Sequence, residues 1–392
     1  MRRVEIGHLQ ISPKGRRYVN EAIKNNRLSY GPFTEKFESL FASLHGAKYA
    51  IASSSGTASL QIALAALKER YKWPDGSEVL VPATTFIATS NIVLYNNLVP
   101  VFVDIEADYY EIDPSKIEKY ITKKTKAIIP VHLFGQPADM APIMKIARRH
   151  KLRVIEDSCE TMLASYKGKS VGTFGDIGCF STYVAHLLTT GVGGLSVTND
   201  PKLAVMLRSL TNHGRDSIYL SIDDDNKVNK KKFHMILKKR FSFVRLGQSA
   251  RITELESALG LAQLEDEFVK QIKQRRKNGE YLTKILEPLS DKIQLANIRP
   301  GNDHSFMMYP IVLRKQKKAK LVEYLEDHGV ETRDLLPLIN QPVYKKLFNL
   351  KAKEYPVSQW LIDSGFYVGC HHGLKKVDLE YIASLVQKFL SK

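Results

Sequence analysis

Residues 172–194 read GTFGDIGCFSTYVAHLLTTGVGG and carry the strongest structural signal in the chain. A β-rich run, DIGCFSTY, leads into the small residues TTGVGG and then into a second β-rich run, GGLSVTN. By itself TTGVGG indicates a tight turn between two strands, where the backbone can approach a ligand closely. Between the runs lies a single histidine, His186, which is either catalytic or a polar residue at the end of a strand. The residues that surround it in the fold decide between these interpretations.

Upstream of this stretch, residues 48–200 alternate short β-rich runs with helical patterns. The runs include KYAIAS, EVLVPA, PVFVDI, AIIPVHLF and LRVIEDS. Buried strands separated by helices predict a mostly parallel sheet covered on both faces. Such sheets bind ligands beyond the carboxyl ends of their strands, so the informative residues are those that follow each apolar run.

Residues 253–286 have apolar side chains at helical spacing and predict one long helix, either straight or kinked, that leads to a second domain. That domain combines strand-like FMMYPIVLR with helical KKAKLVEYLEDHG and LEYIASLVQKFL. Because 392 residues exceed one ordinary core, we expect two domains. We place a large domain with an N-terminal arm at residues 1–250, and a connecting helix with a small domain at 251–392.

The composition is that of a soluble globular protein. No apolar run approaches the roughly 18 residues of a membrane helix, and no signal-peptide pattern opens the chain. We therefore expect no membrane span. The three cysteines, Cys159, Cys179 and Cys370, are scattered, which supports neither a disulfide framework nor a metal site and favours a cytoplasmic location.

The formal charge of +17 raises the question of an anionic partner. The densest basic run, NKVNKKKFHMILKKRF at 226–241, follows an acidic run and indicates a solvated insert or mobile flap. No RNP, zinc-finger or helix-turn-helix signature accompanies the charge. We therefore favour an anionic small substrate, such as a nucleotide sugar, over nucleic acid.

Three strand ends carry candidate functional residues, each with two interpretations. SSSGTASL at 53–60 opens a helix and either binds a phosphate or supplies an ordinary Ser/Thr cap. Asp157, in VIEDSCE, either holds a proton on a heterocycle nitrogen or caps the next helix. Phe86, in TTFIATS, either stacks on a ring or packs in the core.

Taken in order, these signals resemble a family. A phosphate-binding turn, an aromatic residue, a strand-end Asp, and a Ser followed five residues later by a reactive side chain resemble the pyridoxal-phosphate (PLP) enzymes of fold type I. More narrowly, the chain resembles the DegT/DnrJ/StrS-type aminotransferases and dehydratases that act on nucleotide-linked keto sugars. VHLFGQPADM and GTFGDIGCFS are its most specific motifs, and SYGPFTEKFESLFA, PVFVDI and RITELESALGLAQLE extend the match over nearly the whole chain. The resemblance implies an α/β fold with a mostly parallel seven-stranded sheet, helices on both faces and a smaller C-terminal α+β domain.

The resemblance also implies roles for individual residues. Gly56 and Thr57 would bind the cofactor phosphate, with a hydroxyl from Ser181. Phe86 would stack on the pyridine ring. Asp157 would pair with the protonated ring nitrogen, which makes the ring an electron sink. Enzymes of this kind are homodimers in which the partner chain completes each active site.

His186 departs from the family pattern, because the aminotransferases carry at this place the lysine that binds the cofactor covalently. A ring nitrogen cannot form the stable imine that a primary amine forms with an aldehyde. The chain is therefore a non-catalytic homologue, an aminotransferase whose lysine has been replaced by engineering, or an enzyme in which His186 is only a base.

The last interpretation has a precedent in the family. Two kinds of nucleotide-sugar 3-dehydratase carry histidine here, and residues 183–186 resemble theirs. The chain resembles most the GDP-4-keto-6-deoxy-mannose 3-dehydratase of the colitose pathway. The CDP-sugar enzyme of the ascarylose pathway adds an iron–sulfur cluster, which needs about four thiolates; with three scattered cysteines we expect no cluster here.

The resemblance then implies a mechanism. The amine form of the cofactor, pyridoxamine phosphate (PMP), condenses with the C4 ketone of a nucleotide-diphospho sugar. His186 removes a proton from the cofactor's methylene carbon, and the C3 hydroxyl leaves. Hydrolysis releases a 4-keto-3-deoxy sugar, and glutamate restores the amine form. We expect loss of the C3 hydroxyl rather than net amination, with aminotransfer as the alternative.

Other departures concern neighbours of the site. Glu160 stands where the family usually has a glutamine beside the ring, and a second carboxylate near Asp157 would raise one of the two pKa values. Ser249 replaces the asparagine with which the partner chain usually reaches the phosphate. His213 either approaches the sugar or is a hydrogen-bonded turn residue. We expect no metal site, since His371 and His372 have no carboxylate or cysteine at ligand spacing.

Overall fold

The computed structural model describes residues 3–216, 229–239 and 241–391. Within them, seven strands form the large sheet in the order β1-β9-β8-β5-β4-β2-β3, as predicted. The strands are β1 (Tyr49–Ser53), β2 (Glu78–Pro82), β3 (Val99–Val103), β4 (Thr125–Ile128), β5 (Arg153–Asp157), β8 (Ile177–Ser181) and β9 (Gly194–Thr198). Only β9 runs against its neighbours β8 and β1, and the remaining pairs are parallel. The prediction of a mostly parallel sheet is confirmed.

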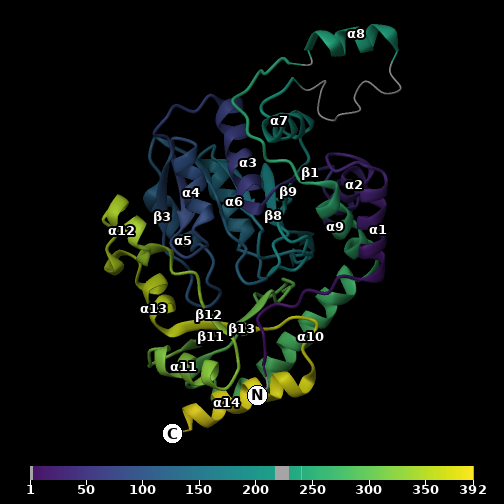
Figure 1. The fold of residues 1–392 in the computed structure, drawn as a ribbon. Coiled ribbons are helices and arrows are strands. Elements are labelled where there is room, and N and C mark those ends of the chain that lie inside the picture. The colour runs from purple at the N-terminus through teal and green to yellow at the C-terminus, as the bar shows by residue number, and fades with distance from the viewer. Residues whose placement is uncertain (1–2, 217–228, 240, 392) are drawn as a thin grey trace.

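Helices cover both faces of this sheet (Figure 1). Alternate residues of a strand serve opposite faces: on β2, Val79 and Val81 join the core under α3 (Gly56–Tyr71), α4 (Ala88–Tyr95) and α7 (Pro201–Thr211), whereas Leu80 packs with α6 (Met140–Arg149). At the β1 end, the second face is covered by α2 (Pro32–His45) and α9 (Glu254–Asp266). Both faces are therefore buried, as a parallel sheet requires.

A second sheet lies below the first in Figure 1 and has the strand order β10-β11-β13-β12. All its pairs are antiparallel, and it packs with α11 (Ala319–Asp327) and α14 (Lys376–Leu390). Its strands are β10 (Ile293–Gln294), β11 (Met308–Leu313), β12 (Thr332–Asp334) and β13 (Gly365–Gly369). The N-terminal segment joins this unit, since Val4 pairs with Val330. The smaller α+β unit is confirmed, while the division of the chain at residue 250 stays a prediction.

The single long helix predicted at 253–286 is in fact two helices. Thr253 begins α9 with a capping box that includes Glu256, and α10 (Phe268–Leu286) follows after one non-helical residue, Glu267. The change of direction lets α9 stay against α1 (Pro13–Lys24) and α2 while α10 packs on α14. The helical spacing of apolar residues continues through Glu267, so the sequence pattern gave no indication of the break.

The basic run at 226–241 lies partly outside the described residues. Its described part forms α8 (Lys230–Lys239), which stands apart from the main body in Figure 1.

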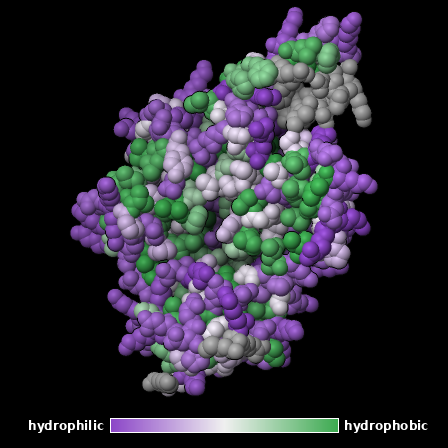
Figure 2. Space-filling model, in the orientation of Figure 1, coloured by the Kyte–Doolittle hydropathy of each residue, from purple (hydrophilic) through white to green (hydrophobic). Residues whose placement is uncertain are grey.

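The remaining described elements are short: α5 (Pro114–Ile117), η1 (Glu118–Tyr120), β6 (Ser165–Tyr166), β7 (Lys169–Ser170), η2 (Glu287–Leu289), η3 (Leu338–Asn340), α12 (Pro342–Phe348), η4 (Ala352–Glu354) and α13 (Pro356–Ser364). No helix in the described ranges is long and apolar enough to cross a membrane. Figure 2 shows hydrophobic residues gathered around a hollow in the middle of one face.

A buried carboxylate explains the GTFGDIGCFS motif. Glu156 on β5 is fully buried and accepts hydrogen bonds from the backbone N–H groups of Gly172 (2.8 Å), Phe174 (2.6 Å) and Gly175 (2.7 Å). His132 lies 3.1 Å from the same carboxylate and accepts a bond from the Ala138 N–H at Nδ1, so its Nε2 carries the proton that it donates to Glu156. These bonds hold the loop before β8 against the end of β5.

We predict that Glu156→Gln lowers the free energy of unfolding by at least about 2 kcal/mol, because the amide nitrogen cannot accept from the backbone donors. Chemical denaturation followed by circular dichroism measures the change. Glu280→Gln, at an exposed position of α10, is the matched control and should be neutral. Equal stability of the two variants would contradict the assigned role.

Candidate active site

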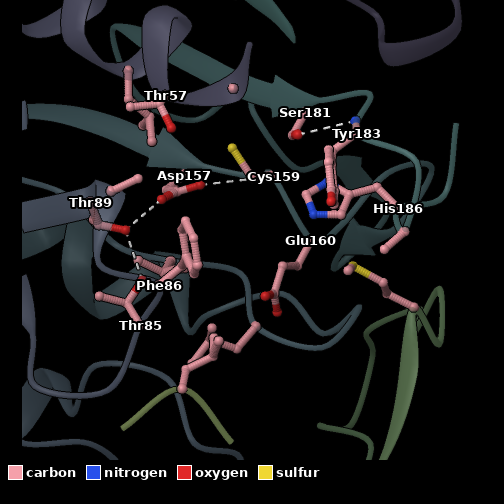
Figure 3. A pocket seen from close by; sticks show the side chains of 18 of the residues that line it. Thr57, Thr85, Phe86, Thr89, Asp157, Cys159, Glu160, Ser181, Tyr183 and His186 are labelled. Carbon is pink, nitrogen blue, oxygen red and sulfur yellow. Dashed lines mark hydrogen bonds between the residues drawn. The ribbon is translucent and has the colours of Figure 1, made fainter. Parts of the chain in front are cut away.

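The residues predicted for phosphate, ring and base meet in one cavity of about 370 Å³. It lies beyond the carboxyl ends of β5 and β8 and the starts of α3 and α4, and β11 and β13 contribute to its wall (Figure 3). The predicted residues that line it are Gly56, Thr57, Phe86, Asp157, Glu160, Ser181 and His186. The placement follows the rule that parallel sheets bind ligands at their carboxyl edge.

The start of α3 forms the cradle at one side of the cavity. Ser55 caps the helix, accepting from the Ala58 N–H at 3.0 Å, so the capping interpretation of this motif holds. Gly56 follows it, and a Cβ there would lie 2.7 Å from Ser181 Cβ and 2.9 Å from Cys159 Sγ. The close approach requires glycine, and the free N–H groups of a helix start suit an anion. The two interpretations of SSSGTASL are thus compatible.

Asp157 is the last residue of β5, is buried, and is held by two donors. Thr89 Oγ donates to Oδ2 at 2.8 Å and the Cys159 N–H donates to Oδ1 at 3.1 Å. No helix begins after it, so the capping interpretation does not hold. Burial raises the pKa of the carboxyl above its ordinary value, and the two hydrogen bonds oppose that shift. The group is oriented into the cavity, ready to pair with a ring N–H.

Of the two interpretations of Phe86, the structure excludes packing in the core. Its side chain is 57% exposed and lines the cavity instead of packing in the core. Figure 3 shows its ring facing the same space as Asp157. An exposed ring beside a carboxylate is available to stack on a planar ligand.

His186 lies in the loop between β8 and β9, with its ring edge-on to Tyr183 (centroids 5.8 Å apart). Its Nδ1 is inaccessible to solvent and has no hydrogen-bond partner. Burial lowers the pKa of His186 to about 4, the buried cation Arg275 lowers it further, and the carbonyls of Ser181 and Cys159 oppose both effects. The imidazole is therefore neutral at pH 7 and can accept a proton.

Glu160 extends into the same cavity (Figure 3). Its Oε2 accepts from the Phe134 N–H at 3.0 Å, and no cation among the described residues forms an ion pair with it. Burial raises the pKa of Glu160 to about 7, with a smaller contribution from the charge of Asp157. The expected coupling of the two carboxyls is therefore present, although burial dominates.

Two predicted residues do not line the cavity. Ser249 is exposed and accepts from Arg251 Nη2 at 3.1 Å. His213 is exposed in a turn with φ of 59°, and its N–H donates to the Gln248 carbonyl at 2.9 Å. The turn interpretation of His213 fits this position. The reach of Ser249 into a partner's site stays a prediction.

Several lining residues escaped the sequence analysis. Thr89, which orients Asp157, lies one turn after Phe86 in TTFIATS. A hydroxyl residue at that spacing could have been predicted to face the same cavity. Five others come from distant segments, and no local sequence pattern indicated them: Ile6, Met307, Met308, Leu336 and Tyr367.

No lysine or arginine of the described residues lines the cavity. In the same part of the chain, no group of three or more His, Cys, Asp or Glu side chains is arranged to hold a metal. His371 stacks on His8 and lies 3.1 Å from the Glu5 carbonyl. Cys179 and Cys370 are buried and Cys159 lies in the cavity wall, all as free thiols.

The chain belongs to the DegT/DnrJ/EryC1/StrS aminotransferase family, whose model matches residues 10–387. It is 32% identical over 393 residues to a GDP-perosamine synthase of Caulobacter vibrioides, covering 99% of this chain and 98% of that protein. It is 30% identical over 387 residues to a dTDP-4-dehydro-2,6-dideoxy-D-glucose 3-dehydratase of Saccharopolyspora spinosa, covering 95% and 83%.

Solved structures place the fold among the fold-type-I PLP-dependent enzymes. The E. coli GDP-4-keto-6-deoxy-D-mannose 3-dehydratase with bound hydrated PLP superposes with a TM-score of 0.87 at 25% identity, over 98% of this chain and 99% of that one. A structure of the same kind of dehydratase with a trapped PLP-glutamate geminal diamine matches with a TM-score of 0.87 at 25% identity, over 97% and 99%. The predicted fold class and family are confirmed.

The raised pKa of Glu160 predicts a pH-dependent stability difference. Its folded pKa of about 7 exceeds the ordinary value of 4.5, so the stability that it contributes is full below pH 4.5 and is lost as pH rises to 7. The loss amounts to about 3 kcal/mol. In the ligand-free protein, Glu160→Gln should gain this amount over wild type between pH 4.5 and 7 and no more above pH 7.

Denaturation at a series of pH values measures the difference, with Glu280→Gln as control. A Glu160→Gln advantage that does not change with pH would show that the carboxyl ionises at its ordinary pKa.

Proposed function

We propose that the protein is a PLP/PMP-dependent 3-dehydratase that removes the C3 hydroxyl of a nucleotide-linked 4-keto-6-deoxy sugar. The observation that carries the proposal is the cavity wall, where His186 lies and no lysine of the described residues does. Covalent attachment of a pyridoxal aldehyde needs a primary amine, which imidazole does not provide. His186 can therefore move protons but cannot recapture the cofactor.

The cavity residues fit the cofactor. The glycine-opened start of α3, with the hydroxyl of Ser181 beside Gly56, suits the phosphate. Phe86 is exposed for stacking, and the Thr89-bound carboxylate of Asp157 suits a protonated ring nitrogen. When bound, the cofactor supplies a pyridinium ring that withdraws electrons from the adjacent carbon. The scattered cysteines support a site without an iron–sulfur cluster.

His186 accepts a proton in this scheme. It is neutral at pH 7 because its pKa is lowered to about 4, so the imidazole has a lone pair free to take the proton. The surrounding apolar wall, which includes Met307 and Leu336, limits the access of water to the reacting carbon. Tyr183 packs edge-on against the imidazole and restricts its orientation.

We propose glutamate as the amino donor, in line with the PLP-glutamate complex of the similar dehydratase. In the net reaction, the keto sugar and glutamate give the 3-deoxy keto sugar, 2-oxoglutarate and ammonia. The sugar carbon is reduced by two electrons as the C–O bond breaks, and glutamate is oxidised by two electrons. The water lost from the sugar is consumed in releasing the ammonia, so the atoms balance.

Aminotransfer is the second candidate, favoured by the 32% identity to a GDP-perosamine synthase. The dehydratase and aminotransferase activities are distinguished by the sugar product that each one forms. With glutamate and GDP-4-keto-6-deoxymannose, we expect a sugar lighter by one oxygen, measured by mass spectrometry. An amino sugar instead would establish aminotransfer, and His186→Lys should then raise its rate; in a dehydratase we expect that variant to lose deoxygenation by about 100-fold or more.

We further propose a homodimer in which Ser249 contributes to the partner's site. The segment before Ser249 exposes an apolar group that a second copy would cover: Phe241, Phe243, Val244 and Leu246. At the cavity mouth, Tyr183 and Val192 are also about half exposed. An exposed apolar surface beside a site is typical of an interface.

Leu246 is 100% exposed, so Leu246→Asp should leave the fold of one chain intact while weakening the dimer. We expect its apparent mass by light scattering to fall toward that of one chain. Leu347→Asp, at a 56% exposed position on α12, is the control that should stay dimeric. A dimer unaffected by both changes would remove this surface from the interface.

A further inference from the structure

We propose that Glu160 is a second catalytic residue, whose carboxyl group gives a proton to the C3 hydroxyl of the sugar as that group leaves. The inference rests on the proposed dehydratase function and assigns the two proton transfers of that reaction to two side chains. His186 takes the proton from carbon, and Glu160 supplies the proton to oxygen.

The geometry gives Glu160 one held oxygen and one free oxygen. Oε2 accepts from the Phe134 N–H at 3.0 Å, whereas Oε1 has no hydrogen-bond partner among the described residues and is not sealed from solvent. Figure 3 shows this carboxyl and the imidazole of His186 pointing into the same space. A proton on Oε1 is therefore presented to whatever occupies the cavity.

The turn that contains the Phe134 N–H, the donor to Glu160, has an unusual backbone conformation. Phe134 has φ of 59°, which is rare for an aromatic residue, and Gly135 follows with φ of 102°. A Cβ on Gly135 would lie 2.5 Å from the Phe306 nitrogen, and the Ser305 N–H donates to the Gly135 carbonyl at 2.7 Å. The fold thus accepts local backbone strain where the Phe134 N–H meets Glu160, as is frequent at functional sites.

The turn is also fixed from its other side. Arg275 is buried on α10 and donates from Nη1 to the carbonyls of Phe306 (3.3 Å) and Met307 (2.9 Å). This segment packs against Gly135 and places Met307 in the cavity wall. The position of the Phe134 N–H, and with it the held oxygen of Glu160, is determined by packing from two sides.

Burial, with a smaller contribution from the charge of Asp157, keeps the carboxyl of Glu160 protonated near neutral pH. The titratable groups that face it are Asp157, Cys159, the hydroxyl of Tyr367 and the neutral imidazole of His186, and none of these is a cation at neutral pH. Burial raises the pKa of Glu160 to about 7, while burial lowers that of His186 to about 4. A pair of groups whose pKa values are displaced in opposite directions supplies an acid and a base at one pH.

The proton that His186 gains and the proton that Glu160 loses balance each other. As the C3–O bond breaks, its electron pair leaves on oxygen, and the proton of Glu160 converts the leaving group to water. His186 has gained a proton from carbon, and Glu160 has lost one. Transfer from the imidazolium to the carboxylate, through water in the cavity, resets both groups without an outside acid or base.

The test is Glu160→Gln, which keeps an oxygen to accept from Phe134 N–H but cannot release a proton. We expect deoxygenation by the variant to fall about 100-fold or more beyond any change in its rate of forming the amine cofactor from glutamate, which absorbance measures separately. Glu160→Asp, which retains an acid, should recover part of the loss. In wild type, deoxygenation should fall as pH rises above about 7, a limb that Glu160→Gln lacks.

A second readout needs no turnover. Infrared difference spectra of wild type minus Glu160→Gln, each loaded with pyridoxal phosphate, should contain the carbonyl band of a protonated carboxyl at pH 6 that disappears well above pH 7. Absence of this band at pH 6 would overturn the inference, as would a Glu160→Gln variant that deoxygenates at the wild-type rate. If wild type itself produces no deoxygenated sugar, the proposed function fails and the inference falls with it.

Discussion

The site depends on the buried carboxylate of Glu156, which ties the loop before β8 to the end of β5. Backbone N–H groups of Gly172, Phe174 and Gly175 converge on it, with His132 from the neighbouring segment. Because successive residues of a strand face opposite ways, Asp157 turns toward the cavity while Glu156 turns away from it. One strand end therefore supplies both the structural anchor and a carboxylate in the cavity wall.

This anchor brings three segments far apart in sequence to the same place. Gly56 at the start of α3 fits against Ser181 and Cys159 so closely that no side chain is tolerated there. The contrast between Asp157, Glu160 and His186 then follows from their surroundings. Asp157 receives two hydrogen bonds, Glu160 receives one, and the Nδ1 of His186 has no partner. For Glu160 and His186, burial outweighs the opposing backbone contacts and favours the neutral forms.

Much of this could be predicted from residues 48–200 alone. Apolar runs at regular intervals predicted the strands, and the residue after each run predicted Gly56, Phe86 and Asp157 at the carboxyl edge. The resemblance to a family added a role for His186 and the expected ring contacts. Where two interpretations were open, exposure excluded core packing for Phe86 and the missing helix excluded capping for Asp157, while their contacts with a cofactor stay predictions.

Other features depend on contacts that no local pattern encodes. Ile6 and Tyr367 reach the cavity from opposite ends of the chain, because the N-terminal segment and β13 belong to the small unit. The break at Glu267 follows from packing of α9 and α10 on different partners. The pKa of Glu160 depends on its burial, which becomes visible only once the turn at Phe134 is in place.

The central claim is that His186 makes this fold remove a hydroxyl group instead of installing an amino group. The most direct test is the nitrogen balance of the reaction. With glutamate isotopically labelled at its amino nitrogen and GDP-4-keto-6-deoxymannose, we expect ammonia and 2-oxoglutarate to appear in equal amounts and the sugar to retain no label. Label retained in the sugar, with no ammonia released, would contradict it.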